Sequence, residues 1–178
     1  MQLDDFNALD EAEATAVARV WAEVPGWVNA VVAGRPYASV DALASYAGAL
    51  AAQWAPADLE AALAAHPRIG ARVSGDDASS AASRREQAAV RAATDDVVEA
   101  IADGNARYEE RFGRVFLIRA AGRAPSEILA ELERRLGNDD DTETREATAQ
   151  LAEIALLRLN DDFAASTAAP ESFAEENE

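Results

Sequence analysis

The residue best suited to proton transfer in this sequence is its single histidine, His66. An unperturbed imidazole has a pKa of about 6.5, so it exchanges protons near neutral pH. The surrounding sequence, His66-Pro67-Arg68-Ile69-Gly70, combines a proline that stiffens the backbone with a glycine that permits a sharp turn. This setting favours a ring held rigidly at the edge of a cleft. The alternative is an exposed histidine at the end of a helix.

A second set of polar side chains shares one face of a predicted helix. Ser83, Glu86 and Gln87 follow one another at spacings of i, i+3 and i+4. Their hydroxyl, carboxylate and amide groups suit a small molecule rich in ureido and imide groups, and the carboxylate is also able to hold an imidazole. The alternative is a solvated helix face on which Glu86 pairs with Arg84 or Arg85.

Arg158 is a charged residue within an apolar helical stripe. It follows Ile154 by four positions and Leu151 by seven, so the three share a helix face. A guanidinium in such a place needs an anion or a path back to water. The anion is either a structural carboxylate or the carboxylate of a substrate held through two parallel hydrogen bonds. Both interpretations remain open at this point.

The sequence gives little support for a metal site, a phosphate-binding loop or a serine nucleophile. A chain with one histidine and no cysteine lacks the usual zinc ligands and has no disulfide. It contains neither a glycine-rich phosphate loop nor a serine nucleophile elbow. The run Asp139-Asp140-Asp141 is more typical of a solvated loop that caps a helix. The sequence therefore predicts no metal site.

The charge of the chain is strongly negative. It carries 33 acidic and 16 basic residues, every basic one an arginine, for a net charge of −17. Such a surface repels nucleic acid and anionic lipid, and we expect neither as a partner. The acidic residues are spread along the chain, which favours adaptation to a salt-rich cytoplasm over a patch for one basic partner protein.

The sequence also favours a soluble cytoplasmic protein. No apolar stretch approaches the ~18 residues of a membrane span. The N-terminus, with Asp4 and Asp5, does not resemble a signal peptide.

The composition predicts an all-α fold. Alanine dominates the apolar residues, and alanine favours helices. We expect a single compact domain over residues 1–160 with about seven or eight helices. One short extended segment is expected from Val115 to Arg119. Residues 161–178 are expected to form an acidic, flexible tail.

The expected helices place the polar groups on three separate elements. A short helix ends just before His66. A long helix from about Ser80 carries the second polar set and kinks near Asp103 and Gly104. The final helix, from about Thr142 to Asn160, carries the arginine.

Together these groups resemble the OHCU decarboxylase family (2-oxo-4-hydroxy-4-carboxy-5-ureidoimidazoline decarboxylase). The resemblance covers the chain to about residue 160. It is carried by His66-Pro67-Arg68-Ile69-Gly70, Ser83 with Glu86-Gln87, and Arg158-Leu159, and by Asn7-Ala8-Leu9, Arg35-Pro36-Tyr37, Asn105-Ala106-Arg107-Tyr108, Arg111-Phe112-Gly113, Phe116-Leu117-Ile118, Gly122-Arg123 and Arg134-Arg135-Leu136-Gly137-Asn138. The chain departs from the pattern at Ile69, where leucine is commoner, and at Val115, where proline is frequent.

The resemblance implies an all-α enzyme of urate degradation that needs no cofactor. Members of the family remove the carboxylate from OHCU, which forms when 5-hydroxyisourate is hydrolysed, and set the handedness of (S)-allantoin. They are commonly dimers, so a homodimer is implied here as well.

The resemblance also implies roles for individual residues. His66 is the main acid and base, and Glu86 orients it or binds the ureido group. The remaining implied contacts to substrate come from Pro67, Ser83, Gln87, Arg158 and the backbone of Phe116, Leu117 and Ile118.

Two alternatives remain beside this interpretation. One is an acidic helical protein-interaction module without catalytic activity, which binds a basic partner through its charged surface. The other is an enzyme of related ureide chemistry that reuses the same site.

Overall fold

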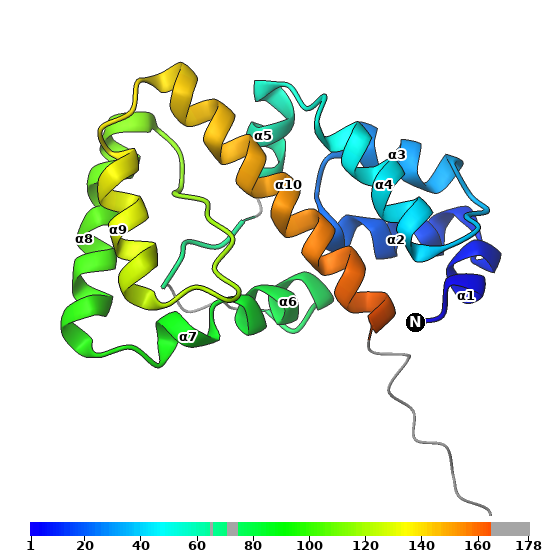
Figure 1. Cartoon of the computed structure of the whole chain (residues 1–178), viewed down its shortest axis with the longest axis horizontal. Helices are drawn as coiled ribbons and strands as arrows, with labels where there is room; N and C mark the ends of the chain where they lie inside the picture. The colour runs from blue at the N-terminus through cyan, green and yellow to red at the C-terminus, as the bar shows by residue number, and fades with distance from the viewer. Residues whose placement is uncertain (65, 71–74, 165–178) are drawn as a thin grey trace, which may run out of the picture.

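One long helix, α10 (Asp140–Ala164), runs diagonally through the middle of the molecule (Figure 1). The computed structural model describes residues 1–64, 66–70 and 75–164. Within these residues the chain forms ten helices and no strand, which confirms the predicted all-α fold. The other helices are α1 (Leu3–Ala8), α2 (Glu11–Trp21), α3 (Pro25–Ala33), α4 (Val40–Ala51), α5 (Pro56–Leu63), α6 (Ala78–Glu86), α7 (Ala88–Arg91), α8 (Asp95–Phe112) and α9 (Pro125–Arg135).

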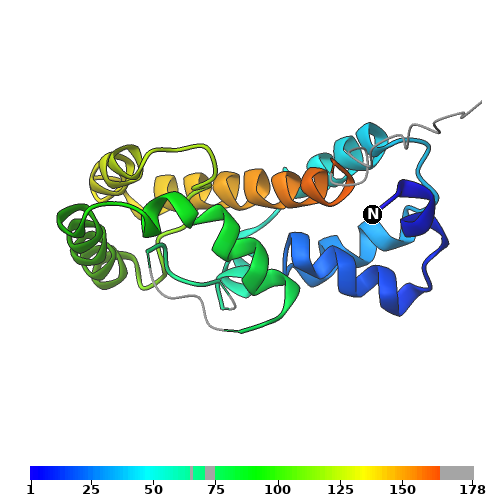
Figure 2. The ribbon, with the colours of Figure 1, turned by 90° about the horizontal axis from the view of Figure 1, so that it is seen from below.

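Helix α10 lies between two groups of helices. It contacts α2, α4 and α5, and α3 packs against both α2 and α4. At the other end of the molecule, α8 packs along α9. Figure 2, seen from below, shows α8 and α9 at one end, the first helices at the other, and α10 spanning the distance between them. Helix α6 contacts α2 and so connects the two groups.

Two hydrophobic cores follow from this layout. The larger core joins the first five helices to α10 and includes a cluster of aromatic rings from Phe6, Trp21, Trp27 and Phe163. The smaller core lies around α8 and α9 and includes Tyr108. Residues that lie between the two cores are therefore held from both sides.

The segment predicted to be extended, Val115 to Arg119, lies in this position and contains neither helix nor strand. Phe116 and Ile118 are buried in the smaller core, whereas Leu117 is buried in the larger. Successive side chains of an extended chain point in opposite directions, which explains the alternation. Figure 1 shows this connection passing between α9 and α10.

The single long helix predicted for the middle of the chain is instead divided into α6, α7 and α8. The divisions fall at Gln87 and just before Thr94, which has extended backbone angles. The chain stays helical at Asp103 and Gly104, where the kink was expected. A Cβ on Gly104 would lie 2.5 Å from Cδ2 of Leu132, so this glycine permits close packing of α8 on α9. This division and the short α1 bring the described helices to ten.

Helix α10 also continues past its expected end at Asn160 to Ala164. Trp21 Nε1 donates to the carboxylate of Asp162 at 2.6 Å, and Phe163 is buried against the aromatic cluster. The first residues of the expected tail thus belong to the folded domain. The rest of that tail, residues 165–178, lies outside the described residues. No helix in the described part of the chain is both long and apolar enough to span a membrane.

Candidate active site

A small hollow between the two cores brings together segments that are far apart in the sequence. Its walls come from the loop after α5, the end of α6, the extended segment and the middle of α10. The lining residues are His66, Pro67, Ile69, Glu86, Gln87, Phe116, Leu117, Ile118, Ala120 and Ile154. Of the predicted site residues, only Ser83 and Arg158 are absent from this lining. Arg158 donates hydrogen bonds to Glu86, which lines the hollow, and also donates one to Ser83.

Arg158 and Glu86 form a buried ion pair at the edge of the hollow, here called the site pair. The Nε of Arg158 donates to Oε1 of Glu86 at 2.6 Å, and Nη2 donates to Oε2 at 2.9 Å. The guanidinium also donates to the hydroxyl of Ser83 at 3.2 Å and to the carbonyl of Val20 at 3.0 Å. The side chains of Arg158 and Glu86 are 7% and 14% exposed. This pair links α6 to α10 across 72 residues of sequence.

The site pair bears on two questions that the sequence leaves open. The guanidinium of Arg158 is bound in two places by a carboxylate of the protein, Glu86, and its contact with a substrate stays a prediction. The second polar set is not a solvated face, since Ser83 is buried and Glu86 pairs with α10. Arg84, one of the alternative partners, donates to the carbonyl of Gly75 instead.

His66 is half-buried, and its surroundings favour the neutral imidazole. Burial first and the positive charge of Arg158 second lower its pKa to about 4, and the negative charge of Glu86 opposes them. The backbone N–H of His66 donates to the carbonyl of Leu63 at 3.1 Å, which extends the turn at the end of α5. Its ring makes no hydrogen bond to the residues that the structure describes. At neutral pH the ring is therefore an uncharged proton acceptor.

The backbone of the extended segment has unused hydrogen-bonding groups beside the hollow. Phe116, Leu117 and Ile118 are at most 5% exposed. The carbonyl of Leu117 accepts a hydrogen bond from Arg135 at 2.8 Å, and the N–H of Arg119 donates to the side chain of Gln150 at 3.0 Å. Among the described residues, the N–H groups of Leu117 and Ile118 have no acceptor. Buried backbone groups are nearly always paired, so unpaired ones beside a hollow indicate a ligand.

Two hydrogen bonds to one peptide unit, Ile69–Gly70, hold the loop that carries His66. The carbonyl of Ile69 accepts from Nδ2 of Asn105 at 2.9 Å, and the N–H of Gly70 donates to Oε1 of Gln87 at 3.0 Å. Both sides of the Ile69–Gly70 peptide are therefore held. Gly70 has a φ of +79°, which a side chain would strain. The amide nitrogen of Gln87 makes no hydrogen bond within the described residues and remains available to a ligand.

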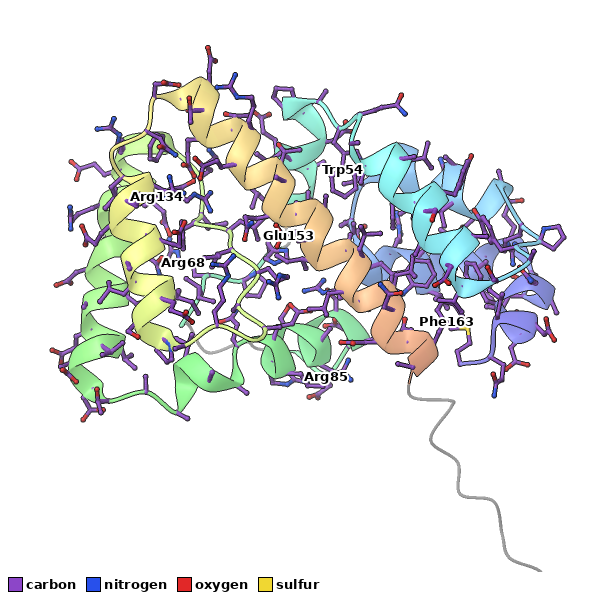
Figure 3. All side chains as sticks on the ribbon, viewed as in Figure 1. Trp54, Arg68, Arg85, Arg134, Glu153 and Phe163 are labelled. Atoms are coloured by element: carbon purple, nitrogen blue, oxygen red, sulfur yellow. The ribbon has the colours of Figure 1, made fainter. Side chains whose placement is uncertain are left out.

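The surface next to this loop is charged. Arg68, which is labelled in Figure 3, forms an ion pair with Glu109 of α8 at 2.5 Å, and its side chain is 60% exposed. Exposed pairs of this kind contribute little to stability. The position of the loop therefore depends on Asn105 and Gln87 more than on this pair.

Three residues that contact the walls of the hollow were assigned no role from the sequence. Asn105 holds the histidine loop, and Arg135 and Gln150 hold the extended segment. Asn105 carries a recognisable signal, because it lies on α8 between the buried Ile101 and Tyr108. A polar residue on a buried stripe has to find a partner. Arg135 carries the same kind of signal, because it follows the buried Ile128 by seven positions and the buried Leu132 by three on α9. Gln150 is only partly buried, and its sequence context carries no comparable signal.

The hollow itself is narrow. Its free volume is about 10 Å³, which is room for about one water molecule. Within the described residues, no group of three or more histidine, aspartate or glutamate side chains is arranged to hold a metal ion.

Comparison with known proteins assigns the chain to a family. The family model described as OHCU decarboxylase matches residues 7–160. A protein from Haloferax volcanii is 29% identical over 92% of this chain and 96% of its own length. A protein from Amia calva is 32% identical over 90% of this chain and 94% of its own length. Both are named 2-oxo-4-hydroxy-4-carboxy-5-ureidoimidazoline decarboxylase.

A solved structure supports the same assignment at the level of the fold. It is a crystal structure of OHCU decarboxylase in the presence of (S)-allantoin, with a TM-score of 0.69 and 22% sequence identity. The match covers 82% of this chain and 96% of that one. The family match, the full-length relatives and the shared helical fold agree with one another. The chain belongs to the OHCU decarboxylase family.

Proposed function

We propose that this chain decarboxylates 2-oxo-4-hydroxy-4-carboxy-5-ureidoimidazoline to (S)-allantoin without a cofactor. The observation that carries the proposal is the meeting of His66, the site pair and the unpaired backbone of the extended segment around one hollow. These groups offer a neutral proton carrier, a balanced pair of charges and backbone donors. Together they suit a small, polar, anionic ring.

The chemistry requires no external electron acceptor. When the bond between the ring carbon and the carboxylate breaks, the electron pair moves toward the neighbouring C=N bond of the ring, and the ring nitrogen takes up a proton from solvent. The neutral imidazole of His66 then accepts the proton of the ring hydroxyl and returns it to the carbon that carries the ureido group. One proton from solvent is consumed for each carbon dioxide released.

Handedness follows from which face of the ring receives the proton. A preference of ~100 to 1 for one face needs only ~2.7 kcal/mol of difference between two transition states. An imidazole fixed by Pro67 and by the clamped Ile69–Gly70 peptide approaches the ring from one side. This fixed approach supports a single enantiomer as product.

The other groups bind and orient the substrate. Each oxygen of Glu86 accepts one bond from Arg158 and retains capacity for a ureido N–H. Arg158 brings positive charge toward the carboxylate or a carbonyl oxygen of the ring. Ser83 and Gln87 contact the polar edge, and the backbone of the extended segment contacts the ring, with the N–H of Ile118 toward a ring oxygen. Because the hollow has room for about one water, substrate binding has to widen it.

The test is an optical assay of allantoin. The substrate is generated from urate with the two preceding enzymes, the protein is added, and circular dichroism follows the formation of (S)-allantoin. We expect the protein to accelerate formation and His66→Asn to abolish the acceleration, while Arg84→Ala, outside the hollow, has no effect. An absence of acceleration at every salt concentration would overturn the proposal.

The same experiment separates the enzyme from an acidic interaction module. A module without catalytic activity would leave allantoin formation unchanged, and H66N would behave like the wild type. An enzyme of related ureide chemistry would bind (S)-allantoin without accelerating its formation from OHCU.

We also propose that the chain forms a homodimer in the cytoplasm. The dimers common in the family support the first part, and the acidic N-terminus and overall charge support the second. Light scattering on the purified protein tests the dimer, and a mass equal to one chain would contradict it. Fractionation of the source cells tests the location.

A further inference from the structure

A second buried ion pair contacts the extended segment at the carbonyl of Leu117. Arg135 of α9 and Glu143 of α10, here called the core pair, have side chains that are 2% and 0% exposed. The Nε of Arg135 donates to Oε1 at 2.9 Å, and Nη2 donates to the same oxygen. The hydroxyl of Tyr108 and the side chain of Asn138 also donate to Glu143. The carboxylate is therefore fully occupied by the protein.

Burying the two charges of this pair costs free energy, so a contribution to stability alone does not explain the pair. Removing two charges from water is unfavourable, and apolar residues of similar size are often as stable or more stable in such places. The core pair is thus a weak device for stability alone. Its contacts to the extended segment suggest what else it does.

Arg135 reaches from the core pair to the wall of the hollow. Its Nη1 donates to the carbonyl of Leu117 at 2.8 Å, and its guanidinium lies 4.7 Å from the centre of the Phe116 ring. Glu143 holds the other edge of the same guanidinium, so Arg135 has one available geometry. The position of the Leu117 carbonyl is fixed in consequence.

Fixing that carbonyl also fixes the N–H of the next residue. In a trans peptide the C=O and N–H of one unit lie in one plane and point in opposite directions. The cis bond among the described residues is Arg35–Pro36, so the Leu117–Ile118 peptide is trans. The N–H of Ile118 therefore points away from Arg135. Ile118 lines the hollow, is 5% exposed, and has no acceptor for this N–H within the described residues.

We propose that the core pair is a positioning device that aims the N–H of Ile118 at an oxygen of the substrate. The inference rests on the proposed function, since it assigns this donor to the same hollow and reaction. Arg135 and Glu143 do not touch the substrate and act through the Leu117–Ile118 peptide. A donor fixed before the reaction stabilises oxygen that gains negative charge, and losing one such donor typically lowers kcat by about 10²–10³.

Two variants of the core pair separate positioning from stability. Arg135→Lys keeps a charge beside Glu143, but a single ammonium group cannot hold both the carboxylate and the Leu117 carbonyl in the same planar geometry. The double variant Arg135→Met with Glu143→Leu removes both charges and leaves none buried and unpaired. The matched control is Arg134→Lys. Arg134, labelled in Figure 3, is the neighbouring arginine on α9, is 49% exposed, and pairs with Glu131 and Glu146.

Steady-state kinetics give the first readout. We expect kcat to fall about 10-fold for Arg135→Lys and about 100-fold for the double variant, with a smaller change in KM. The enantiomeric excess of the allantoin is expected to fall in both, whereas Arg134→Lys keeps wild-type values. A double variant with wild-type kcat and wild-type enantiomeric excess overturns the inference while the proposed function stands. An inactive wild type overturns both.

A measurement on the wild type keeps the inference testable if the variants do not fold. On addition of (S)-allantoin, we expect the amide proton of Ile118 to move downfield in the NMR spectrum. The amide proton of Arg119, already bonded to Gln150, serves as the control and is expected to move less. An Ile118 amide that does not respond while the His66 ring signals do would overturn the inference.

Discussion

The site pair and the core pair are both arginine–glutamate pairs that join distant helices, yet their carboxylates are in different states. Glu143 of the core pair accepts from Arg135, Tyr108 and Asn138 and is fully buried. Glu86 of the site pair accepts only from Arg158 among the described residues and is 14% exposed beside the hollow.

The difference indicates what each pair is able to do. A carboxylate whose oxygens still have room, next to a hollow, is able to share its bonds with a ligand. One that is enclosed and saturated has no bond to share with a ligand and acts only through the protein groups that it holds. Matched substitutions in the two glutamates test this contrast, because Gln keeps the shape of Glu and removes its charge.

The largest effect is expected on activity, from Glu86→Gln. The substitution removes the negative charge beside His66 and Arg158 and weakens the hold on the ureido group. We expect kcat/KM to fall by about 10²-fold or more, with a loss of stability smaller than that of the corresponding change in the core pair. The allantoin assay and urea unfolding measure the two quantities. Unchanged kcat/KM would mean that the site pair is only structural.

The next effect is expected on stability, from Glu143→Gln. It leaves the guanidinium of Arg135 buried without its counter-charge, which typically costs about 3–5 kcal/mol. Urea unfolding measures the change, and Glu153→Gln, whose side chain is 45% exposed on the same helix, is the control. If Glu143→Gln were no more destabilising than Glu86→Gln, the distinction between the two pairs would be lost.

The charges of the site pair also set the proton affinity of His66. Because the chain has one histidine, its Cε1 proton is assigned in an NMR titration without further variants. We expect a midpoint at about pH 4 in the wild type and a higher midpoint in Arg158→Met, since the positive charge is removed and Glu86 remains. Arg134→Met is expected to leave the midpoint unchanged. A wild-type midpoint near 6.5 would contradict the environment described for the ring.

The lowered pKa of His66 predicts how the free energy of unfolding changes with pH. An unfolded chain binds a proton at His66 near pH 6.5 and the folded chain only near pH 4. The unfolded state therefore binds more protons between these values, and stability falls as pH decreases from about 6.5 to 4. We expect this part of the loss to be absent in His66→Asn. Equal slopes for the two proteins in urea unfolding would refute the assignment.

The smallest effect on stability per charge is expected from added salt. Salt screens the exposed charges of the surface more strongly than the two buried pairs, so it distinguishes the two kinds of charge. With a net charge of −17, repulsion between exposed carboxylates destabilises the fold at low ionic strength. We expect the thermal unfolding midpoint to rise from dilute buffer to molar potassium chloride. The differences between the Gln variants and the wild type are expected to change less, because buried pairs are screened weakly. A midpoint that does not rise would contradict salt adaptation.

Much of the fold could be predicted from local patterns. The prolines in the first turns of α5 and α9 and the apolar spacing of the chain are local signals of helix. Gly104 shows where such reasoning fails. A glycine in a helix suggests a kink when only local propensity is considered, but here it removes a clash with Leu132, which is 28 residues away and invisible to a local rule.

The sequence by itself determined which side chains are able to do chemistry. One histidine in a stiff turn, a polar helix face and an arginine on an apolar stripe are properties of residue type and spacing. They depend on helical periodicity and on the cost of burying charge, which act over a few residues.

Only the tertiary structure decided how those side chains pair. That Arg158 binds Glu86 and that Arg135 holds the Leu117 carbonyl depends on how α10 and α9 pack across the two cores. Hydrogen bonds form within about 3 Å, whereas the partners are separated by 72 and 18 residues of sequence. Packing, rather than local propensity, brings them within that distance.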